Sequence, residues 1–412
     1  MKQRAALLGF LAVLVSSAWA QEMAAPKTIP HLDHVFVIMM ENHGYGEIIN
    51  NPNAKFINQY AQSANLATNY FAVAHPSLTN YLEVVGGSNF GVLSDNAPDW
   101  HNGKCTTNLA SGIADTDNPP SPNVCPITGV GMDAPTPKLD CSNEVQGPPC
   151  EVNLDGKAWF PAAQTTGTTI AEQLVAAGMT WKTYQENLPL TGPDTVNYSD
   201  GNFTNNTDFS KIKPVLNPPL SSGDVVQLYA AKHNPFVYFQ DVQQGTDPRV
   251  SYANISAFDG LSGLWGDLSS GKIPNFSFIV PSQCNDQHGR GNSTAFCNYD
   301  PDSNGKKSGL NPALTILGDQ AVEKIVTAIH GSSAWTNGNS AIVVIWDEND
   351  YAVQPIINKV VAIVDTNYGT HGVQSSGFYT HFSLLKSIES GFQLPCLNHA
   401  CDSTVNVMSD LF

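Results

Sequence analysis

Three short polar segments of this 412-residue sequence carry residue types that could do chemistry together. They are His75-Pro76-Ser77-Leu78-Thr79-Asn80-Tyr81, Glu41-Asn42 upstream, and Asp347-Glu348 far downstream. Together they offer a hydroxyl nucleophile in Ser77, an amide donor in Asn80 and several oxygen ligands for a hard or borderline cation. These are the ingredients of metal-assisted phosphoryl transfer.

Two apolar runs are expected to position the acidic residues. Residues 34–40 (HVFVIMM) and 341–346 (AIVVIW) are typical of central strands buried on both faces; the first ends directly on Glu41-Asn42 and the second on Asp347-Glu348. In open α/β sheets ligands gather beyond the carboxyl ends of the strands. Adjacent carboxylates repel one another unless a cation or a proton lies between them, so the pattern predicts a metal site. A solvated turn over 347–350 (DEND) is the alternative, and the same pattern at Glu41 favours the metal.

Ser77 is expected in the first turn of a helix over residues 77–85. A nucleophile at that place would face free backbone N–H groups and the positive end of the helix dipole. Both would favour an incoming phosphate.

Two further segments carry candidate site residues. Asp286 and His288 follow a third apolar strand, expected over 275–280, and could supply two ligands or a ligand and a general acid. A surface loop that happens to contain one histidine is the alternative. His381 stands at the start of a helix expected over 381–390 and is a further candidate site residue. The alternative is that it caps the helix or lies on the protein surface.

Helical and strand patterns alternate along the rest of the chain. This alternation predicts an α/β fold with a mostly parallel central sheet and helices on both faces. Helices are expected over 55–64, 77–85, 169–178, 224–231, 257–268, 313–329 and 381–390, and strands over 34–40, 66–71, 180–186, 235–240, 275–280, 340–346 and 360–364.

The first twenty residues read as a secretory signal peptide. Lys2 and Arg4 precede an apolar run over 5–15 that is too short to span a bilayer, and small residues lead to a cut before Gln21. Without Lys2 and Arg4, 17 basic residues remain of 19, against 36 acidic residues, for a formal charge of −19. That balance disfavours binding to nucleic acid or anionic membranes. We therefore expect a secreted or periplasmic protein without a stable membrane anchor.

The remaining residues, 21–412, are expected to form one domain, because no internal repeat or long linker interrupts them. Residues 90–160 form an irregular excursion rich in Pro, Gly, Asn and Asp, which we expect to overhang the site. Eight cysteines in an exported chain suit four disulfides, although sequence alone does not fix the pairing. Proximity favours Cys105 with Cys125, Cys141 with Cys150, Cys284 with Cys297, and Cys396 with Cys401.

Six segments resemble, in the same order, the phosphoesterase family of secreted acid phosphatases and bacterial phospholipases C, which share the alkaline-phosphatase-like fold. The segments are VIMMENHGY (37–45), HPSLTNYLEVVGGS (75–88), TIAEQLVAAGMTWKTYQE (169–186), IPNFSFIVPSQCNDQH (273–288), AIVVIWDEND (341–350) and YTHFSLLKSIES (379–390). The resemblance implies a phosphoric ester hydrolase with Ser77 as nucleophile and Asn80 as a phosphate ligand. It also implies a divalent metal ion held around Glu41, Asn42, Ser77, Asp347 and Glu348, with Asp286, His288 and His381 as further metal or phosphate contacts.

The chain departs from the family pattern in two places. The phospholipase C branch usually carries Thr-x-Pro-Asn-Arg where this chain has residues 77–81 (SLTNY), so the phosphatase branch fits better. Residues 349–351 (NDY) stand where many members of the family continue with Gly-Gly-x-x-Asp-His. A histidine that could bind a second metal ion is therefore missing here, and the number of metal ions stays open.

The favoured function is hydrolysis of a small-molecule phosphate monoester through a phosphoserine, with His288 assisting the leaving oxygen. A phospholipase C or another phosphodiesterase acting on a phospholipid or diester is the close alternative, since it would use the same nucleophile and metal. A non-catalytic extracellular binding module that has kept the fold is a third hypothesis.

Overall fold

The computed structural model of this chain describes residues 29–92, 94–101, 124–133, 164–188, 192–193, 228–289, 312–349 and 358–412. The expected signal peptide, most of the 90–160 excursion, and Cys105, Cys141, Cys150 and Cys297 lie outside these residues. Cys396 and Cys401 form the disulfide expected from their proximity. Cys125 and Cys284 are also disulfide-bonded. Within the described residues, no helix has the length and apolar character needed to cross a membrane.

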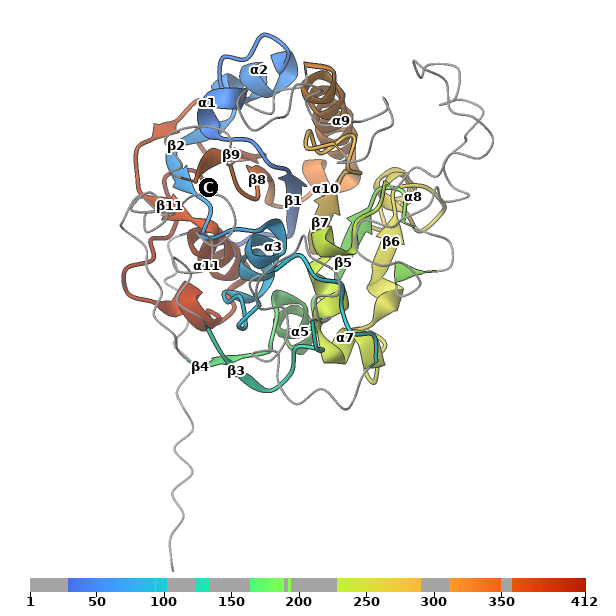
Figure 1. Cartoon of the computed structure of the whole chain (residues 1–412). Coiled ribbons are helices and arrows are strands. Elements are labelled where there is room, and N and C mark those ends of the chain that lie inside the picture. The colour runs from blue at the N-terminus through green and yellow to red at the C-terminus, as the bar shows by residue number, and fades with distance from the viewer. Residues whose placement is uncertain are drawn as a thin grey trace, which may run out of the picture.

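A nine-stranded sheet organises the fold (Figure 1). Strand β1 (His34–Met40) lies between β7 (Phe276–Val280) and β8 (Ser340–Trp346) and is parallel to both. The side chains of β7 and β8 are buried throughout, because both faces of the sheet are covered. The sequence therefore located the central strands correctly.

The remaining strands extend the sheet in both directions, in the order β10-β2-β9-β8-β1-β7-β5-β6. Strand β9 runs antiparallel to its neighbours β2 and β8, whereas the other pairings in this sheet are parallel. The expected α/β class with a mostly parallel sheet is confirmed. These strands are β2 (Asn65–Phe71), β5 (Trp181–Gln185), β6 (Ile255–Ala257), β9 (Lys359–Thr366), β10 (Gln374–Ser375) and β11 (Tyr379–Thr380), which pairs with β2.

Two groups of helices flank the sheet (Figure 1). One group contains α2 (Lys55–Ser63), α8 (Leu264–Ser270), α9 (Pro312–His330) and α10 (Ser333–Thr336). The other contains α3 (Ser77–Gly86), α5 (Ile170–Ala176) and α11 (His381–Phe392). Shorter helices are α1 (Tyr45–Ile48), which follows β1, and α7 (Gln240–Gln244).

Local sequence fixes the ends of two of these helices. At the start of α5 the Thr169 hydroxyl accepts a hydrogen bond from the Ala171 N–H, while Glu172 accepts one from the Thr169 N–H. This is a capping box. Helix α3 ends at Gly87, whose φ of 68° suits glycine, and a Cβ there would come within 2.5 Å of the Leu397 carbonyl oxygen.

Three expected elements are wrong in detail. Residues 235–240 are not a strand, because Pro235–Tyr238 form a 3₁₀ helix, η6. The residues of η6 are buried, so this short turn has the same apolar composition as a buried strand. The helix expected over 257–268 begins only at Leu264, because a turn with Gly260 at φ 92° precedes it. Of the helix expected over 224–231, residues 228–230 are irregular, and a short 3₁₀ helix, η5 (Ala231–His233), follows.

A small second sheet joins a described part of the excursion to the segment that follows the excursion. Strands β3 (Val130–Met132) and β4 (Gln164–Thr166) pair antiparallel. Two further 3₁₀ helices are η7 (Tyr252–Asn254) and, after α11, η8 (Asn398–Cys401). This pair of strands is not predicted from the sequence, because each strand is only three residues long.

Candidate active site

The acidic residues meet at the carboxyl edge of the sheet. In the parallel ladder Met40 is in register with Trp346, so Glu41 and Asp347 leave neighbouring strands side by side. The Asp347 N–H donates to the Met40 carbonyl at 3.1 Å, and the Glu41 N–H donates to the Asp286 carbonyl at 2.9 Å. Parallel pairing thus brings together three segments that are far apart in the sequence.

The Ser77 hydroxyl points into this cluster from the first turn of α3. Its Oγ lies in short contact with Glu41 Oε1 and 3.1 Å from Glu348 Oε1. The side chain is buried. A hydroxyl has one proton, so one of these carboxylates can accept it while the other remains beside the oxygen lone pairs.

The amide groups at the start of α3 are less free than expected. The Leu78 N–H donates to Asp95 Oδ1 at 3.0 Å, and the Thr79 N–H donates to the Pro76 carbonyl at 3.1 Å. Asp95 belongs to the beginning of the 90–160 excursion, so this part of the excursion does border the site. The expectation of free backbone N–H groups at this end of the helix is therefore wrong for Leu78 and Thr79.

Asn80 is bonded mainly to the backbone. Its Oδ1 accepts from the N–H groups of Val73 and Ala74, both at 3.0 Å, and its Nδ2 donates to the Ala74 carbonyl at 2.7 Å. Nδ2 also lies 3.4 Å from Glu348 Oε2. Asn80 therefore fixes the segment that leads to Ser77, and its role as a phosphate ligand stays a prediction.

Glu41, Asp347 and Glu348 form one group with the arrangement of a metal site. Each offers an oxygen within 4.8 Å of the others, and all three side chains are buried. Neither side-chain oxygen of Asp347 accepts a hydrogen bond from the described residues. Asn42 Nδ2 lies 3.3 Å from Glu348 Oε1 and completes the set of residues expected around a cation.

A second group shares Glu41 with the first. Glu41, His233 and Asp286 each offer a donor atom within 4.8 Å of the others, and all are buried. His233 is not among the site residues predicted from the sequence. It comes from η5 in the segment AKHNP, where no periodicity, strand end or paired acid marks it as special.

Cationic and imidazole groups surround Glu41. His233 Nε2 and His288 Nδ1 lie 2.8 and 3.0 Å from its Oε2, and Lys232 Nζ lies 3.8 Å from its Oε1. Burial alone would raise the pKa of Glu41, but His233, His288 and Lys232 outweigh it and hold that pKa well below its usual value. Glu41 is therefore a carboxylate.

The pKa values of the other buried acids in the cluster are shifted in the opposite direction. Burial, reinforced by neighbouring carboxylates, raises the pKa of Asp286, Asp347 and Glu348 well above their usual values. Such groups are stabilised as anions when a cation binds among them.

His381 is close to the site, but its ring nitrogens face other groups. Nε2 lies 2.7 Å from the main-chain carbonyl oxygen of Asp347, and Nδ1 lies 2.9 Å from the Tyr70 hydroxyl. Its imidazole therefore orients the acidic segment instead of pointing at a ligand of its own.

Tyr81 contributes a buried hydroxyl to the cluster. Burial first, and then the charges of four surrounding carboxylates, raise its pKa well above the usual value. The hydroxyl has no hydrogen-bond partner among the described residues. The ring stacks on His233 with a centroid distance of 5.2 Å and an interplanar angle of 9°.

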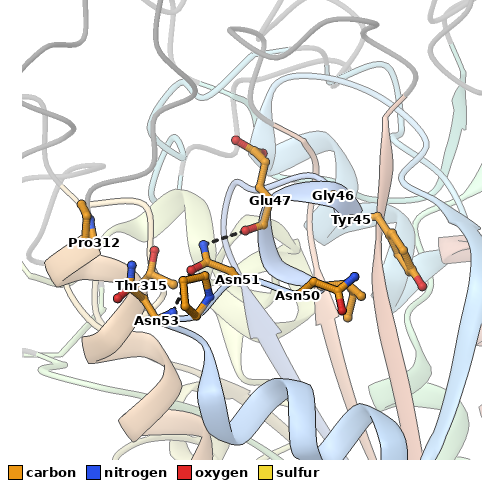
Figure 2. Close-up of a pocket in the computed structure, with 10 residues that line it drawn as sticks. Tyr45, Gly46, Glu47, Asn50, Asn51, Asn53, Pro312 and Thr315 are labelled. Carbon is orange, nitrogen blue, oxygen red and sulfur yellow. Dashed lines mark hydrogen bonds between the residues drawn. The ribbon is translucent and has the colours of Figure 1, made fainter.

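A separate pocket of about 640 Å³ lies beside α1 (Figure 2). In Figure 2 a dashed line joins the Asn51 side chain to the Glu47 carbonyl oxygen, 2.8 Å away. Thr315 of α9 also lines the pocket. None of the lining residues belongs to the carboxylate cluster: they are Tyr45, Gly46, Glu47, Ile49, Asn50, Asn51, Pro52, Asn53, Pro312 and Thr315.

Comparison with known proteins agrees with the resemblance seen in the sequence. Residues 48–299 match the model of the Phosphoesterase family, and this chain belongs to that family. It is 23% identical over 365 residues to an acid phosphatase of Aspergillus fumigatus, covering 88% of this chain and 55% of that protein. The chain thus spans about half of the fungal relative.

Two further proteins are similar over most of the chain. A phosphatidylinositol-3-phosphatase of Mycobacterium tuberculosis is 22% identical over 402 residues, covering 97% of this chain and 91% of that protein. Among solved structures, a protein of the alkaline phosphatase superfamily from Vibrio parahaemolyticus has a TM-score of 0.43 and 13% identity, covering 89% of this chain and 68% of that one.

Proposed function

We propose that this protein is a secreted, metal-dependent phosphoesterase that hydrolyses phosphate monoesters through a phosphoserine intermediate. The observation that carries the proposal is the position of Ser77 Oγ, in contact with both Glu41 and Glu348 and at the edge of a buried carboxylate cluster. A serine in such surroundings combines a nucleophile with proton acceptors.

The residues present fit a divalent cation. Both carboxylate oxygens of the buried Asp347 lack a hydrogen-bond partner among the described residues, which is a large cost for an anion unless a cation binds there. Glu41, Asn42, Ser77, Asp347 and Glu348 would hold the ion. When bound, a divalent cation lowers the pKa of a coordinated hydroxyl and neutralises phosphate charge.

In the proposed reaction Ser77 Oγ attacks phosphorus while Glu41 or Glu348 accepts its proton. A bond forms between Oγ and phosphorus, and the bond from phosphorus to the leaving oxygen breaks. His288, whose ring contacts Glu41, donates a proton to that oxygen. Water then attacks the phosphoserine, so that phosphate leaves and Ser77 regains its proton.

A monoester is the favoured substrate. The relatives named above are called an acid phosphatase and a phosphatidylinositol-3-phosphatase, names that both describe removal of a phosphate group. Phospholipase C or other phosphodiesterase activity is the second candidate, because a diester would meet the same nucleophile. Export, to the periplasm or the medium, is also proposed, from the N-terminal sequence.

An activity panel tests this function. The purified protein is assayed against p-nitrophenyl phosphate, bis(p-nitrophenyl) phosphate and phosphatidylcholine, each with and without EDTA. We expect EDTA-sensitive hydrolysis of the monoester and a phosphorylated Ser77 peptide after acid quenching. Faster turnover of the bis-ester or of phosphatidylcholine would identify the alternative enzyme, and a correctly folded protein that cleaves none of the three would favour a binding module.

A further inference from the structure

We propose that Asp95 makes the site select phosphate groups that carry one negative charge over those that carry two. This inference deepens the proposed function and rests on it, because it concerns the ionic form of the same substrate. The substrate class is a singly charged phosphate ester, which is either a monoester that keeps one proton or a diester. Asp95 is not among the site residues predicted from the sequence.

The Asp95 carboxylate binds two hydrogen-bond donors beside the nucleophile. Its Oδ1 accepts from the Leu78 N–H at 3.0 Å, and its Oδ2 accepts from the Lys232 ammonium group at 2.8 Å. Leu78 directly follows Ser77 in the first turn of α3. An N–H at a helix start and an ammonium group are donors that a phosphate oxygen would use. A phosphate that approaches Ser77 therefore meets a carboxylate on this side of the site.

The ammonium group of Lys232 is shared between Asp95 and the carboxylate cluster. It lies 2.8 Å from Asp95 Oδ2 and 3.8 Å from Glu41 Oε1. The charge of Asp95 also reaches Glu348, because burial first and the Asp95 charge next raise the pKa of that carboxyl. Glu348 Oε1 in turn lies 3.1 Å from Ser77 Oγ. The negative charge of Asp95 thus acts at the place where a phosphate would bind.

Little water surrounds this ion pair. The side chain of Asp95 is 13% exposed and that of Lys232 is 11% exposed. Charges that are largely removed from water are only weakly screened by solvent and salt. At a separation of several ångströms, repulsion by such a carboxylate weakens the binding of a second substrate charge by roughly 10-fold, after partial compensation by the ammonium group.

Contacts on both sides fix the segment that carries Asp95. Before it, the Thr79 hydroxyl donates to the Val92 carbonyl at 3.3 Å. After it, the Tyr238 hydroxyl donates to the Asn96 carbonyl at 3.0 Å. The carboxylate is therefore held at the start of α3, and a phosphate would bind with Asp95 in place.

A purely structural ion pair is the alternative. In that role Asp95 and Lys232 would join the excursion to η5, and breaking the pair would lower the Tm without changing which phosphate is preferred. The two roles differ in one measurable quantity. It is the ratio of kcat/KM for a doubly charged ester to kcat/KM for a singly charged ester with the same leaving group.

Two p-nitrophenyl esters test the inference. At about pH 8, p-nitrophenyl phosphate carries two negative charges, whereas methyl p-nitrophenyl phosphate carries one. Asp95→Asn keeps the shape and an oxygen acceptor for the Leu78 N–H but removes the charge. We expect the ratio of kcat/KM for the monoester to that for the diester to rise about 10-fold. Asp247→Asn is the matched control, because it breaks the exposed ion pair with Arg249, and its ratio should equal that of the wild type.

Binding of inorganic phosphate provides a readout that does not depend on turnover. Titration calorimetry at about pH 8 compares Ser77→Ala with Ser77→Ala/Asp95→Asn, both loaded with Mn²⁺, and we expect phosphate to bind about 10-fold more tightly to the double variant. Lys232→Met, in the same Ser77→Ala background, should bind phosphate more weakly, because the charge of Asp95 is then uncompensated. Should Asp95→Asn not fold, this opposite shift carries the comparison.

The outcomes separate the inference from the proposed function. An unchanged ratio and an unchanged phosphate affinity in folded Asp95→Asn proteins overturn the role of Asp95 and leave the proposed phosphatase intact. A wild-type protein that cleaves neither ester overturns the function, and phosphate binding then still decides the role of Asp95. At about pH 4 both esters carry one charge. We expect faster cleavage of the monoester there, and faster cleavage of the diester would overturn the monoester assignment alone.

Discussion

The imidazole of His381 lies 2.7 Å from the main-chain carbonyl oxygen of Asp347 and donates a hydrogen bond to it from Nε2. A carbonyl oxygen only accepts, so Nε2 carries the proton and Nδ1 accepts from the Tyr70 hydroxyl, 2.9 Å away. Burial lowers the pKa of His381 to about 4, which keeps the ring neutral. His381 therefore acts through Asp347, as a positioning residue.

Replacing His381 should weaken metal binding. In His381→Ala the acidic segment loses its anchor, and the affinity for Mn²⁺, measured by competition with a chelator, should fall about 10- to 100-fold. Tyr70→Phe is the milder comparison, since His381 still donates to Asp347, and a smaller loss is expected. An unchanged affinity in a His381→Ala protein with a lower Tm would mean that the residue supports only the fold.

Ser77→Ala should abolish turnover of a phosphate monoester. Removing the nucleophile from a covalent mechanism is expected to lower kcat by about three orders of magnitude or more, while circular dichroism remains that of the wild type. Thr79→Val removes a hydroxyl from the same turn of α3, but that hydroxyl contacts the Val92 carbonyl at 3.3 Å, and kcat should stay close to the wild-type value. Near-normal activity of folded Ser77→Ala would exclude Ser77 as nucleophile.

The parts of the site that follow the strands could be predicted from the sequence. A buried parallel strand has a distinctive apolar run, and parallel pairing brings the residues after two such runs to one edge, as it does for Glu41 and Asp347. That reasoning needs only local pattern and a general property of sheets.

The remaining parts depend on tertiary contacts that no local pattern carries. His233 reaches Glu41 from a short 3₁₀ helix, and the role of His381 depends on a backbone carbonyl, which any residue could provide. Residues 235–238 were mistaken for part of a strand because a buried turn and a buried strand share the same apolar composition.

Chelation should lower both the activity and the Tm of the wild-type protein. The carboxylates of Glu41, Asp347 and Glu348 lie close together in a buried setting and repel by a few kcal/mol when no cation lies among them. Asp347→Asn removes a ligand and one of the repelling charges, so this variant should be inactive and its Tm should hardly respond to EDTA. Differential scanning fluorimetry with and without EDTA measures the effect. A fully active protein without stoichiometric metal would contradict the mechanism.

His399 should make stability depend on pH on the alkaline side. Its Nε2 lies 2.6 Å from Asp133 Oδ2 and its Nδ1 lies 2.8 Å from Asp402 Oδ2, linking the excursion to the C-terminal region. Burial would lower the pKa of His399, but hydrogen bonds and charges from Asp133 and Asp402 outweigh it and raise this pKa from 6.5 to about 9.

Because the folded-state pKa of His399 lies above the unfolded value, its stabilising contribution is complete below pH 6.5 and is lost as the pH rises through about 9. The loss is at most roughly 3.5 kcal/mol, from about 1.4 kcal/mol per pKa unit. Urea unfolding at several pH values measures it. Other groups also titrate in this range, so the informative quantity is the difference between wild type and His399→Gln, which should shrink steadily from pH 6.5 to 9.5. A difference that stays constant over that range would show that the imidazole of His399 is neutral in the folded protein.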